Sequence, residues 1–316
     1  MNNIGIDIGG TKIAIGLVDK EKKLVDRIDI SIIIKNGPNL IITEIIKQTK
    51  NIIKRNNLTG KQINSIGIGV PGTVNIKTGY VILAPNIYWR DVPLGKMFNN
   101  SFPSTPIYID QDTNTAALGE YALQKDKDIN NLYYITISTG VGSGLILNGK
   151  LYRGSLNTAG EIGHTIVEKN GIPCTCGNKG CLQMYAKGPA IADEAMRRIK
   201  KGAKTSLKKY LLNNRTLTAQ QIGNEANKGD SFSINILLWA ADYVGMALAN
   251  VVNLLNPDLI IIGGGVARCG AFFIDAITNA TINYCYPPIR ESVRISCTTQ
   301  WEKSGIIGGA MLYSFF

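Results

Sequence analysis

The stretch Ile4-Gly5-Ile6-Asp7-Ile8-Gly9-Gly10-Thr11-Lys12, which runs on into the apolar residues Ile13 to Val18, sets the architecture of this chain. An apolar strand, a glycine turn and a second apolar run predict a β-hairpin. The pattern returns from Tyr134 to Leu147, with Thr139-Gly140-Val141-Gly142-Ser143-Gly144 as its turn. Because one arrangement occurs twice, we expect a duplicated fold with a cleft between its halves.

Other segments carry helix and strand patterns of their own. Apolar residues at helical spacing predict helices, and short β-rich runs that end in glycine, proline or aspartate predict strands. The expected elements are a helix from Asn39 to Asn57, a strand from Ser65 to Val70 that leads into Pro71-Gly72, a strand at Ile107-Tyr108-Ile109, a helix that begins near Asp112, a long helix from about Asp230 that Asn256-Pro257 ends, a strand from Leu259 to Ile262, and a closing helix from Gly305 to Ser314.

Length and composition narrow the class of protein. A chain of 316 residues predicts roughly two domains, and 45% hydrophobic content is ordinary for a globular protein. We see no run of about eighteen apolar residues and therefore expect no membrane span. The first residues lack a basic region and a cleavage site, so we expect no signal peptide. Scattered Cys269, Cys285 and Cys297 are typical of a reducing compartment, which predicts a cytoplasmic protein.

The net charge of +11 leaves two kinds of partner to consider. A basic protein can bind nucleic acid, but it can also bind anionic small molecules. The densest basic stretch has no interleaved aromatic residue before Tyr210 and no recognition motif, so we interpret it as a solvated helix face and expect no nucleic-acid partner. Its basic residues are Arg197, Arg198, Lys200, Lys201, Lys204, Lys208 and Lys209.

The single histidine of the chain lies just ahead of three clustered cysteines. His164 precedes Cys174-Thr175-Cys176-Gly177-Asn178-Lys179-Gly180-Cys181, and one histidine with three cysteines is a usual ligand set of closed, structural zinc sites. The alternatives are free thiols or a disulfide, although a Cys-x-Cys pair rarely meets disulfide geometry. The spacing therefore predicts structural Zn²⁺ held by His164, Cys174, Cys176 and Cys181.

Three glycine loops follow strands and predict a site for a polyphosphate. In the first, Asp7 is a strand-end carboxylate suited to Mg²⁺, while Gly9 and Gly10 allow backbone amides to approach phosphate. Thr11 and Lys12 add a hydroxyl donor and a positive charge. The second loop offers Thr139, Gly140 and Gly142, and the third Gly264 and Gly265. The first is not a Walker A motif, and the third does not match a Rossmann fingerprint.

Asp112 follows a strand at the point where a helix is expected to begin. One interpretation is a helix N-cap, a position that aspartate fills well. The other is a general base, since phosphoryl transfer needs a group that orients and deprotonates the attacking hydroxyl. The two interpretations are compatible with each other.

Taken together, these residues resemble the ROK family of sugar kinases and repressors along essentially the whole chain. The motifs that carry the resemblance are the first glycine loop, Pro71-Gly72, Pro85-Asn86, Asp112 with Asn114 and Ala116-Ala117-Leu118-Gly119-Glu120, the second glycine loop, Gly160-Glu161-Ile162-Gly163-His164, and the cysteine cluster. The resemblance implies an α/β, actin-like, hexokinase-type ATPase fold. We expect a small domain of residues 1–115 plus 303–316 and a large domain of residues 116–302, which contains a zinc loop at 164–181.

The resemblance also implies an activity: ATP-dependent phosphorylation of a hexose at its 6-hydroxyl, with a glucose-like substrate first and Mg²⁺ bound with ATP. Asp112 would be the catalytic base. The sugar hydroxyls would be held by Asp112 together with Gly72, Asn86, Glu161 and His164. His164 would use one ring nitrogen for zinc and the other for the sugar. A homodimer or homotetramer is implied as well.

Two glutamines depart from the family pattern at positions that touch sugar. Gln111 stands where the family usually has asparagine, and Gln183 where it usually has glutamate. A neutral amide still bonds a hydroxyl, so simple tolerance and a changed preference both stay open. Fructose, N-acetylmannosamine and N-acetylglucosamine are alternative substrates, and polyphosphate is an alternative phosphoryl donor.

Sugar-responsive transcriptional regulators are the second function class in the family. They carry a helix-turn-helix ahead of the first glycine loop, which begins here at residue 5. We therefore expect an enzyme rather than a repressor.

Overall fold

A computed structural model describes residues 2–31, 36–211 and 216–316. By contacts between Cα atoms, the chain divides into two compact units. Unit 1 comprises everything up to Asn130, with Gly144–Ala159 and Gln300–Phe316, and unit 2 comprises Asn131–Ser143 and Gly160–Thr299. The expected boundary after residue 115 differs from this division, which places the helix that begins at Asp112 in unit 1 because it packs against the C-terminal helix of that unit.

The first sheet has five strands in the order β3-β2-β1-β4-β8. The predicted hairpin is confirmed, since β1 pairs antiparallel with β2, and β2 pairs antiparallel with β3. β1, β4 and β8 run parallel, in a register that aligns Asp7 with Gly69 and Gly69 with Asp110. The strands are β1 (Asn2–Ile8), β2 (Lys12–Val18), β3 (Leu24–Ser31), β4 (Ile63–Val70) and β8 (Ile107–Gln111).

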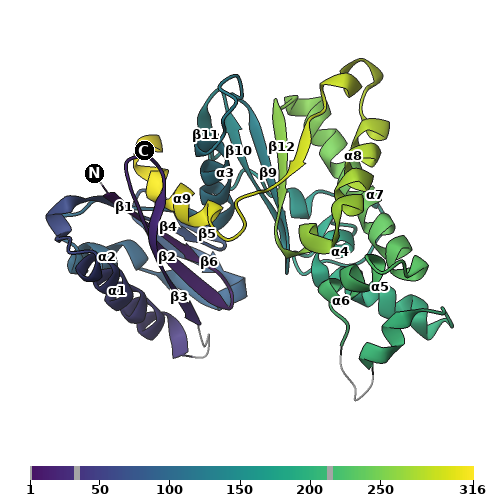
Figure 1. Cartoon of the computed structure of the whole chain (residues 1–316), viewed down its shortest axis with the longest axis horizontal. Helices are drawn as coiled ribbons and strands as arrows, with labels where there is room; N and C mark the ends of the chain where they lie inside the picture. Colours follow the sequence, from purple (N-terminus) through teal and green to yellow (C-terminus); the bar gives the residue numbers. More distant parts are fainter. Residues whose placement is uncertain (1, 32–35, 212–215) are drawn as a thin grey trace. The chain divides into compact units, whose positions relative to one another are not determined.

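Helices cover both faces of this sheet (Figure 1). Along β2, Ile13 and Ile15 face the apolar residues of α1, whereas Ala14 and Val18 face α9, because alternate strand residues point to opposite faces. The helices of unit 1 are α1 (Gly37–Arg55), α2 (Leu94–Ser101), α3 (Asp112–Ala122) and α9 (Ser304–Met311). A smaller antiparallel sheet contains β5 (Thr73–Asn75), β6 (Tyr80–Ala84) and β7 (Trp89–Val92).

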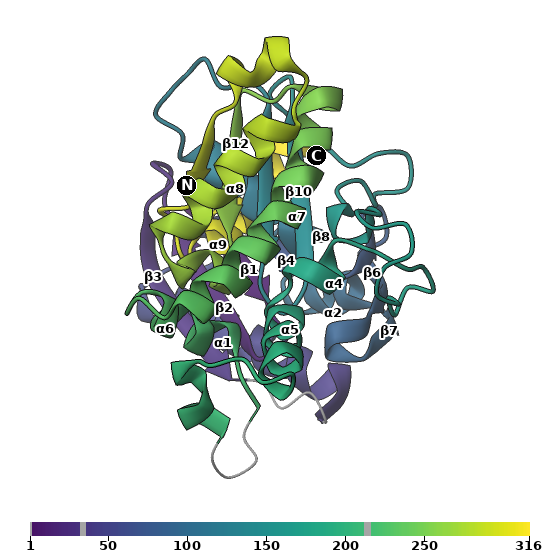
Figure 2. The ribbon, with the colours of Figure 1, turned by 90° about the vertical axis from the view of Figure 1, so that its right-hand side faces the viewer.

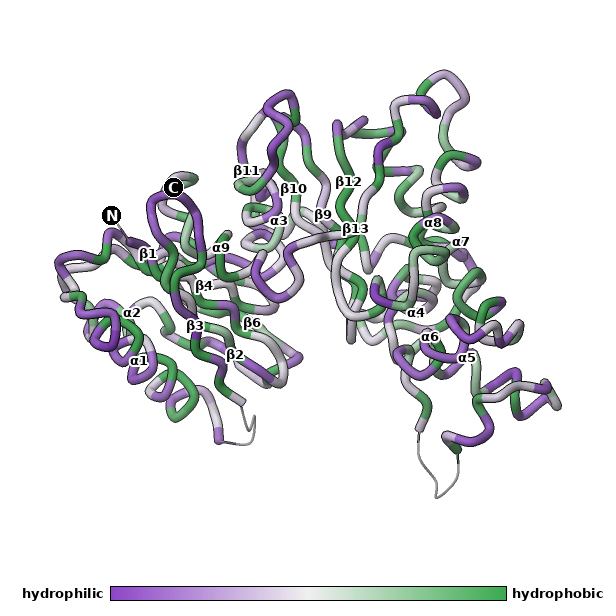
Figure 3. The backbone as a smooth tube through the Cα atoms, in the orientation of Figure 1, coloured by the Kyte–Doolittle hydropathy of each residue, from purple (hydrophilic) through white to green (hydrophobic). Residues whose placement is uncertain are grey.

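The second five-stranded sheet repeats the strand order of the first. Its order is β11-β10-β9-β12-β13, with β10 antiparallel to β11 and with β9, β12 and β13 parallel. Hydrophobic residues run along β12, as they do along β1 and β4 (Figure 3). The predicted duplication is thereby confirmed. The strands are β9 (Leu132–Ile137), β10 (Val141–Leu147), β11 (Lys150–Tyr152), β12 (Leu259–Gly263) and β13 (Ile295–Cys297).

Unit 2 is built around the helix α7 (Ser231–Leu255), which lies beside α8 (Ala271–Tyr284) (Figure 2). Asp230 caps α7 by accepting the Ser233 N–H at 2.9 Å, and Asn256 ends it in the left-handed conformation. Within the described residues, α7 alone is long and apolar enough to cross a membrane, but 56% of its apolar window is buried inside the fold. It is therefore the central helix of this unit.

The remaining elements are short. Unit 2 also contains α4 (Gln183–Ala186), α5 (Gly188–Lys200) and α6 (Ala219–Ala226). The 3₁₀ helices are η2 (Gly60–Gln62), η3 (Pro85–Ile87), η4 (Ile162–His164), η5 (Ser206–Leu211), η6 (Gly265–Cys269), η7 (Pro287–Ser292) and η8 (Leu312–Phe315).

Helix α9 touches its neighbours through bare backbone. It packs against β1 and β4 on one side and against α3 on the other, and glycines line each contact. A Cβ atom at any of these glycines would overlap a carbonyl oxygen, so only glycine fits. The distances from the ideal Cβ position to oxygen are 1.7 Å (Gly5 to Ile306), 1.9 Å (Gly67 to Gly309), 2.0 Å (Gly119 to Ser304) and 1.6 Å (Gly308 to Thr115).

We expect Gly308→Ala to lower the free energy of unfolding by about 3 kcal/mol or more, because the new methyl group has no space. Helix propensity alone would favour alanine by about 1 kcal/mol. A loss of stability in Gly308→Ala therefore reports the close contact between α9 and α3 rather than helix propensity. Urea unfolding measures it. Gly60→Ala is the control, since nothing lies within 4 Å of that Cβ position. Equal stability of the two variants would contradict this account of α9.

Candidate functional site

Two aspartates reach the same edge of the first sheet. Asp7 is the last residue but one of β1, and the strand register places it beside Gly69 and then Asp110 on the two neighbouring parallel strands. Asp112 begins α3, two residues beyond Asp110. Adjacent strands lie about 4.8 Å apart, so this edge is narrow. The structure therefore brings Asp7 and Asp112 to one edge of unit 1.

Asp7 is partly buried. Burial raises its pKa to about 6, although the charge of Arg27 acts in the opposite direction. Its oxygen lies only 2.7 Å from the Cβ position of Gly305, in the first turn of α9. An ionised carboxylate in such a place is stabilised by a bound cation, and oxygen donors of this kind suit Mg²⁺.

The first glycine turn is closed by a hydrogen bond from the Gly9 N–H to the Lys12 carbonyl at 3.0 Å. The Cβ position of Gly10 lies 3.8 Å from the Asn86 carbonyl oxygen, so the turn adjoins a residue expected at the sugar site. Thr11 is exposed. The Lys12 ammonium lies 3.3 Å from Asp29 and 3.6 Å from Glu302, pairs that the sequence did not indicate. Such exposed pairs contribute little to stability.

Asp112 does not occupy the N-cap position of α3. Gln111 takes that position, and it is buried. The Asp112 side chain accepts the N–H of Thr113 at 2.8 Å. The N-cap interpretation of Asp112 is therefore wrong by one position, and the general-base interpretation stays a prediction. Gly69 packs within 3.3 Å of the Asp112 Cα atom, measured from its Cβ position, which fixes the backbone of Asp112 against β4.

A buried ion pair lies directly behind Asp112. The Asp110 carboxylate is fully buried and accepts the Gln111 N–H at 2.8 Å, the Asn114 amide at 2.8 Å and the Arg153 Nε–H at 2.7 Å. The Arg153 guanidinium also donates to the Phe315 carbonyl oxygen at 3.3 Å. No motif indicated Arg153, because it lies 43 residues from Asp110 in the chain and only the fold brings the two together.

In unit 2, the second and third glycine loops meet. Gly264 adopts φ of 86°, and its Cβ position lies 2.4 Å from the Ile137 carbonyl oxygen, two residues before Thr139. The turn is closed by the Ser138 N–H, which donates to the Gly140 carbonyl at 2.8 Å. Gly265 follows at the end of β12. Thr139 and Gly140 therefore follow the carboxyl end of β9, beside Gly264 and Gly265 at the carboxyl end of β12.

Gly142, expected in the second glycine turn, lies instead in β10, and this strand contacts the segment that carries Glu161. The buried Ser143 hydroxyl donates to the Gly160 carbonyl at 2.6 Å and lies 2.7 Å from the Tyr133 hydroxyl. The Cβ position of Gly163 lies 2.2 Å from the Val141 carbonyl oxygen. Both sides of Glu161 are thus fixed to β10, while Glu161 itself is exposed.

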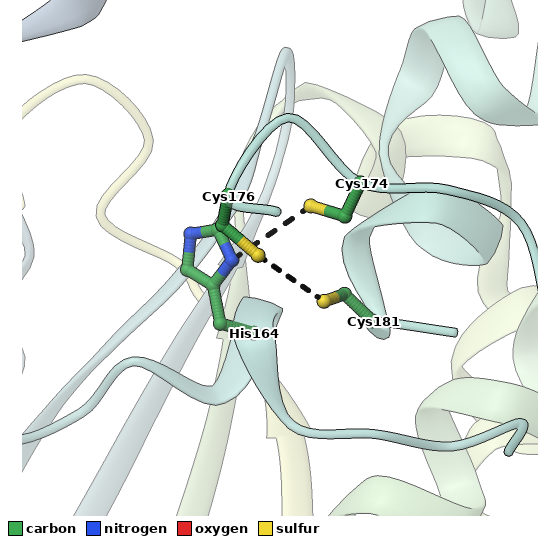
Figure 4. A group of neighbouring side chains, drawn as sticks. All are labelled: His164, Cys174, Cys176 and Cys181. Atoms are coloured by element: carbon green, nitrogen blue, oxygen red, sulfur yellow. Dashed lines mark hydrogen bonds between the residues drawn. The ribbon is translucent and has the colours of Figure 1, made fainter. Parts of the chain in front are cut away.

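The histidine and the three cysteines converge as the sequence predicted (Figure 4). Their ligand atoms all lie within 4.8 Å of one another. Cys176 and Cys181 sulfurs are 3.6 Å apart, and Cys174 sulfur is 3.9 Å from His164 Nδ1. The edge of a tetrahedral zinc–thiolate site is about 3.8 Å, so the cluster fits zinc. The second ring nitrogen of His164 points away from the cysteines.

The three thiols differ in their surroundings. Burial opposes ionisation of Cys174, but the Cys176 N–H and the Gln183 amide outweigh it and lower its pKa to about 6. Burial and then the neighbouring Cys176 and Cys174 raise the pKa of Cys181 to about 12. The Gln183 amide nitrogen lies 3.1 Å from the Cys174 sulfur. The structure thus shows Gln183 in contact with the cluster, a role that sequence reasoning missed.

Comparison with known proteins identifies the class. The sequence matches the ROK family over residues 3–314. A glucokinase from Halalkalibacterium halodurans is 33% identical over 310 residues, spanning 98% of this chain and 94% of that protein. A putative xylose repressor from Caldicellulosiruptor sp. is 30% identical over 308 residues, spanning 96% of this chain and 76% of the repressor. This chain belongs to the ROK family.

Solved structures agree with this placement. A ROK family glucokinase from Streptomyces griseus, in complex with glucose and AMPPNP, superposes with a TM-score of 0.83 at 28% identity and covers 99% of each chain. The expected actin-like, hexokinase-type fold is confirmed. The cluster of His164 with the three cysteines is typical of the zinc site of this family. The relatives include both sugar kinases and repressors.

We expect Arg153→Met to lower the free energy of unfolding by about 3–5 kcal/mol, because the buried Asp110 carboxylate loses its cation. Chemical denaturation measures the change. The double variant Asp110→Asn with Arg153→Met should recover part of the loss, since it buries no unpaired charge. Arg197→Met is the control, because Arg197 is half exposed and its partner Glu194 keeps a second cation, Arg198, so this variant should remain close to wild type. A stable single variant at Arg153 would show that the pair does not anchor this region.

Proposed function

We propose that this chain is an ATP-dependent sugar kinase that phosphorylates the 6-hydroxyl of a glucose-like hexose. The observation that carries the proposal is the shared edge of Asp7 and Asp112, a cation-seeking carboxylate beside a general-base candidate. The glucokinase names of its relatives and the glucose and AMPPNP in the Streptomyces griseus structure support it.

Unit 1 supplies the acid–base part of the proposed reaction. Asp112 accepts the proton of the sugar hydroxyl as that oxygen bonds to the γ-phosphorus of ATP, while the bond from the γ-phosphorus to the β-phosphate oxygen breaks and ADP leaves. The buried Asp110–Arg153 pair fixes the start of α3 and therefore the place of this base. Asp7 would hold Mg²⁺ bound with ATP, which neutralises phosphate charge. The amides of Gly9 and Gly10, with Thr11 and Lys12, would contact phosphate oxygens.

Unit 2 supplies further contacts in this proposal. The loop at Thr139, Gly140 and Gly142 and the loop at Gly264 and Gly265 would hold the nucleotide with backbone amides. Glu161 and the outer nitrogen of His164 would bind sugar hydroxyls. Zinc would fix the tautomer of His164 and leave no open coordination position, which makes its role structural. Gly72, Asn86 and Gln111 would complete the sugar contacts from unit 1.

The second part of the proposal is the identity of the sugar substrate. Glucose comes first because glucokinase relatives match nearly the whole chain. A coupled assay with ATP and Mg²⁺ over glucose, fructose, N-acetylmannosamine and N-acetylglucosamine ranks the candidates by kcat/KM. Polyphosphate in place of ATP tests the donor. Phosphorylation of no sugar with either donor would sink the kinase proposal, and sequence-specific DNA binding would then favour a repressor.

We expect Asp112→Asn to lower kcat by about 100-fold or more, because the amide cannot take the hydroxyl proton. The sugar dissociation constant should stay near the wild-type value, since the amide retains the shape of the carboxylate. Steady-state kinetics and calorimetry measure the two quantities. Asp193→Asn, on the exposed side of α5, is the matched control. Turnover of Asp112→Asn close to wild type would remove Asp112 from the role of base.

We expect Cys176→Ser to lose the bound zinc and to weaken sugar binding, because the His164 ring loses the metal that fixes it. Zinc is counted by elemental mass spectrometry, and the sugar dissociation constant by calorimetry. Cys176 is exposed, so the change costs little packing. Cys285→Ser, outside the cluster, should keep its zinc. Unchanged sugar affinity in a zinc-free protein would show that the metal and sugar sites are independent.

A further inference from the structure

Gln183 lies where the start of α4 meets the segment that carries His164 and the segment that carries Cys174. It is the first residue of α4 and follows Cys181 by two positions. The preceding Leu182 N–H donates to the Thr165 carbonyl at 2.9 Å, which fixes the start of α4 beside His164. Across the loop, the Gln183 side-chain amide reaches the sulfur of Cys174 at 3.1 Å. One residue therefore connects the histidine segment with the cysteine segment.

The assignment of the amide follows from the chemistry of its partner. A glutamine side chain offers an NH₂ donor at one position and a carbonyl acceptor at the other. A metal-bound thiolate has only lone pairs to offer, so the NH₂ group must face it. The opposite orientation would place the amide oxygen against a negatively charged sulfur. The contact is thus an N–H donation to Cys174.

The charge of the occupied site makes this donation favourable. Three thiolates and a neutral imidazole around Zn²⁺ leave one net negative charge. A neutral N–H donor stabilises such a site without adding charge. A carboxylate at the same position cannot donate when ionised, and it brings a second negative charge close to Cys174. At this position, glutamine therefore stabilises the metal-bound cluster, whereas glutamate destabilises it.

A second contact from the same helix supports the loop. The Tyr185 hydroxyl, two residues after Gln183, accepts the Ile172 N–H at 2.9 Å. Its ring packs on Tyr243 of α7, with ring centroids 4.2 Å apart. Helix α4 is therefore anchored to the core of unit 2, and Gln183 extends from a fixed base. The donor is pre-positioned rather than free to follow the sulfur.

We propose that Gln183 is a positioning residue of the zinc site, which holds the Cys174 thiolate through its amide N–H and thereby tightens the bound metal. The proposal rests on the zinc site proposed above, and it assigns to Gln183 a task different from that of a charged sugar contact. Residues that orient metal ligands in this way are commonly worth 10–100-fold in metal affinity.

The test compares the zinc dissociation constants of wild type, Gln183→Ala and Gln183→Glu, each measured by competition with a chromophoric chelator. We expect Gln183→Ala to bind zinc about 10–100-fold more weakly, and Gln183→Glu more weakly still. Gln220→Glu, on an exposed position of α6, makes the same change of charge in the same unit and should bind zinc as wild type does. Circular dichroism of the zinc-loaded proteins checks that each variant folds.

A second measurement separates positioning from general stability. With Co²⁺ in place of zinc, the thiolate-to-metal absorption band of Gln183→Ala should shift, because Cys174 has lost a hydrogen bond. Wild-type zinc affinity in Gln183→Ala, or in Gln183→Glu, would overturn the proposal. A wild-type protein that binds no zinc would overturn it together with the zinc site. A protein that binds zinc but phosphorylates no sugar would sink only the kinase.

Discussion

The contact on which unit 1 depends is the meeting of bare backbones around α9. Gly5 and Gly67 bring two strands against this helix, and Gly308 brings the helix against α3. Because no side chain separates them, the sheet, α9 and α3 are held at the closest distance that helices and strands allow. The positions of Asp7, at the end of a strand, and Asp112, at the start of α3, follow directly from that packing.

Each unit contains a group of charged or ionisable side chains, and the charge is balanced in a different way in the two units. In unit 1, the buried Asp110 carboxylate is matched by Arg153 and by neutral donors, so the chain itself supplies the balance. Within the part of the chain that the structure describes, no hydrogen bond or ion pair joins the sulfurs of Cys174, Cys176 and Cys181 to a lysine or arginine, and a metal ion would balance the charge of their thiolates. The first arrangement fixes the start of α3, where Asp112 lies, and the second fixes His164.

Local patterns predicted much of this molecule, because their causes are local. Both glycine hairpins, the caps of α7 at Asp230 and Asn256, and the ligand cluster at His164 all follow from residues that are close in sequence. The pairing of Asp110 with Arg153, the ion pairs of Lys12 and the contact of Gly163 with Val141 join residues that only the fold makes neighbours. Prediction from neighbouring residues also has a limit, as Asp112 shows. Gln111, the residue before it, occupies the N-cap position of α3, and only the backbone geometry distinguishes these two residues.

Unit 1 is formed from segments that are far apart in the chain, and this affects how the protein folds during synthesis. Its sheet is formed from the first part of the chain, yet α9, which closes one face of that sheet, is separated from it by the whole 160–299 segment of unit 2. A ribosome must therefore finish unit 2 before unit 1 can close. Until then, the glycine-lined face of β1 and β4 lacks its partner α9, and closing unit 1 requires contacts between residues far apart in the chain.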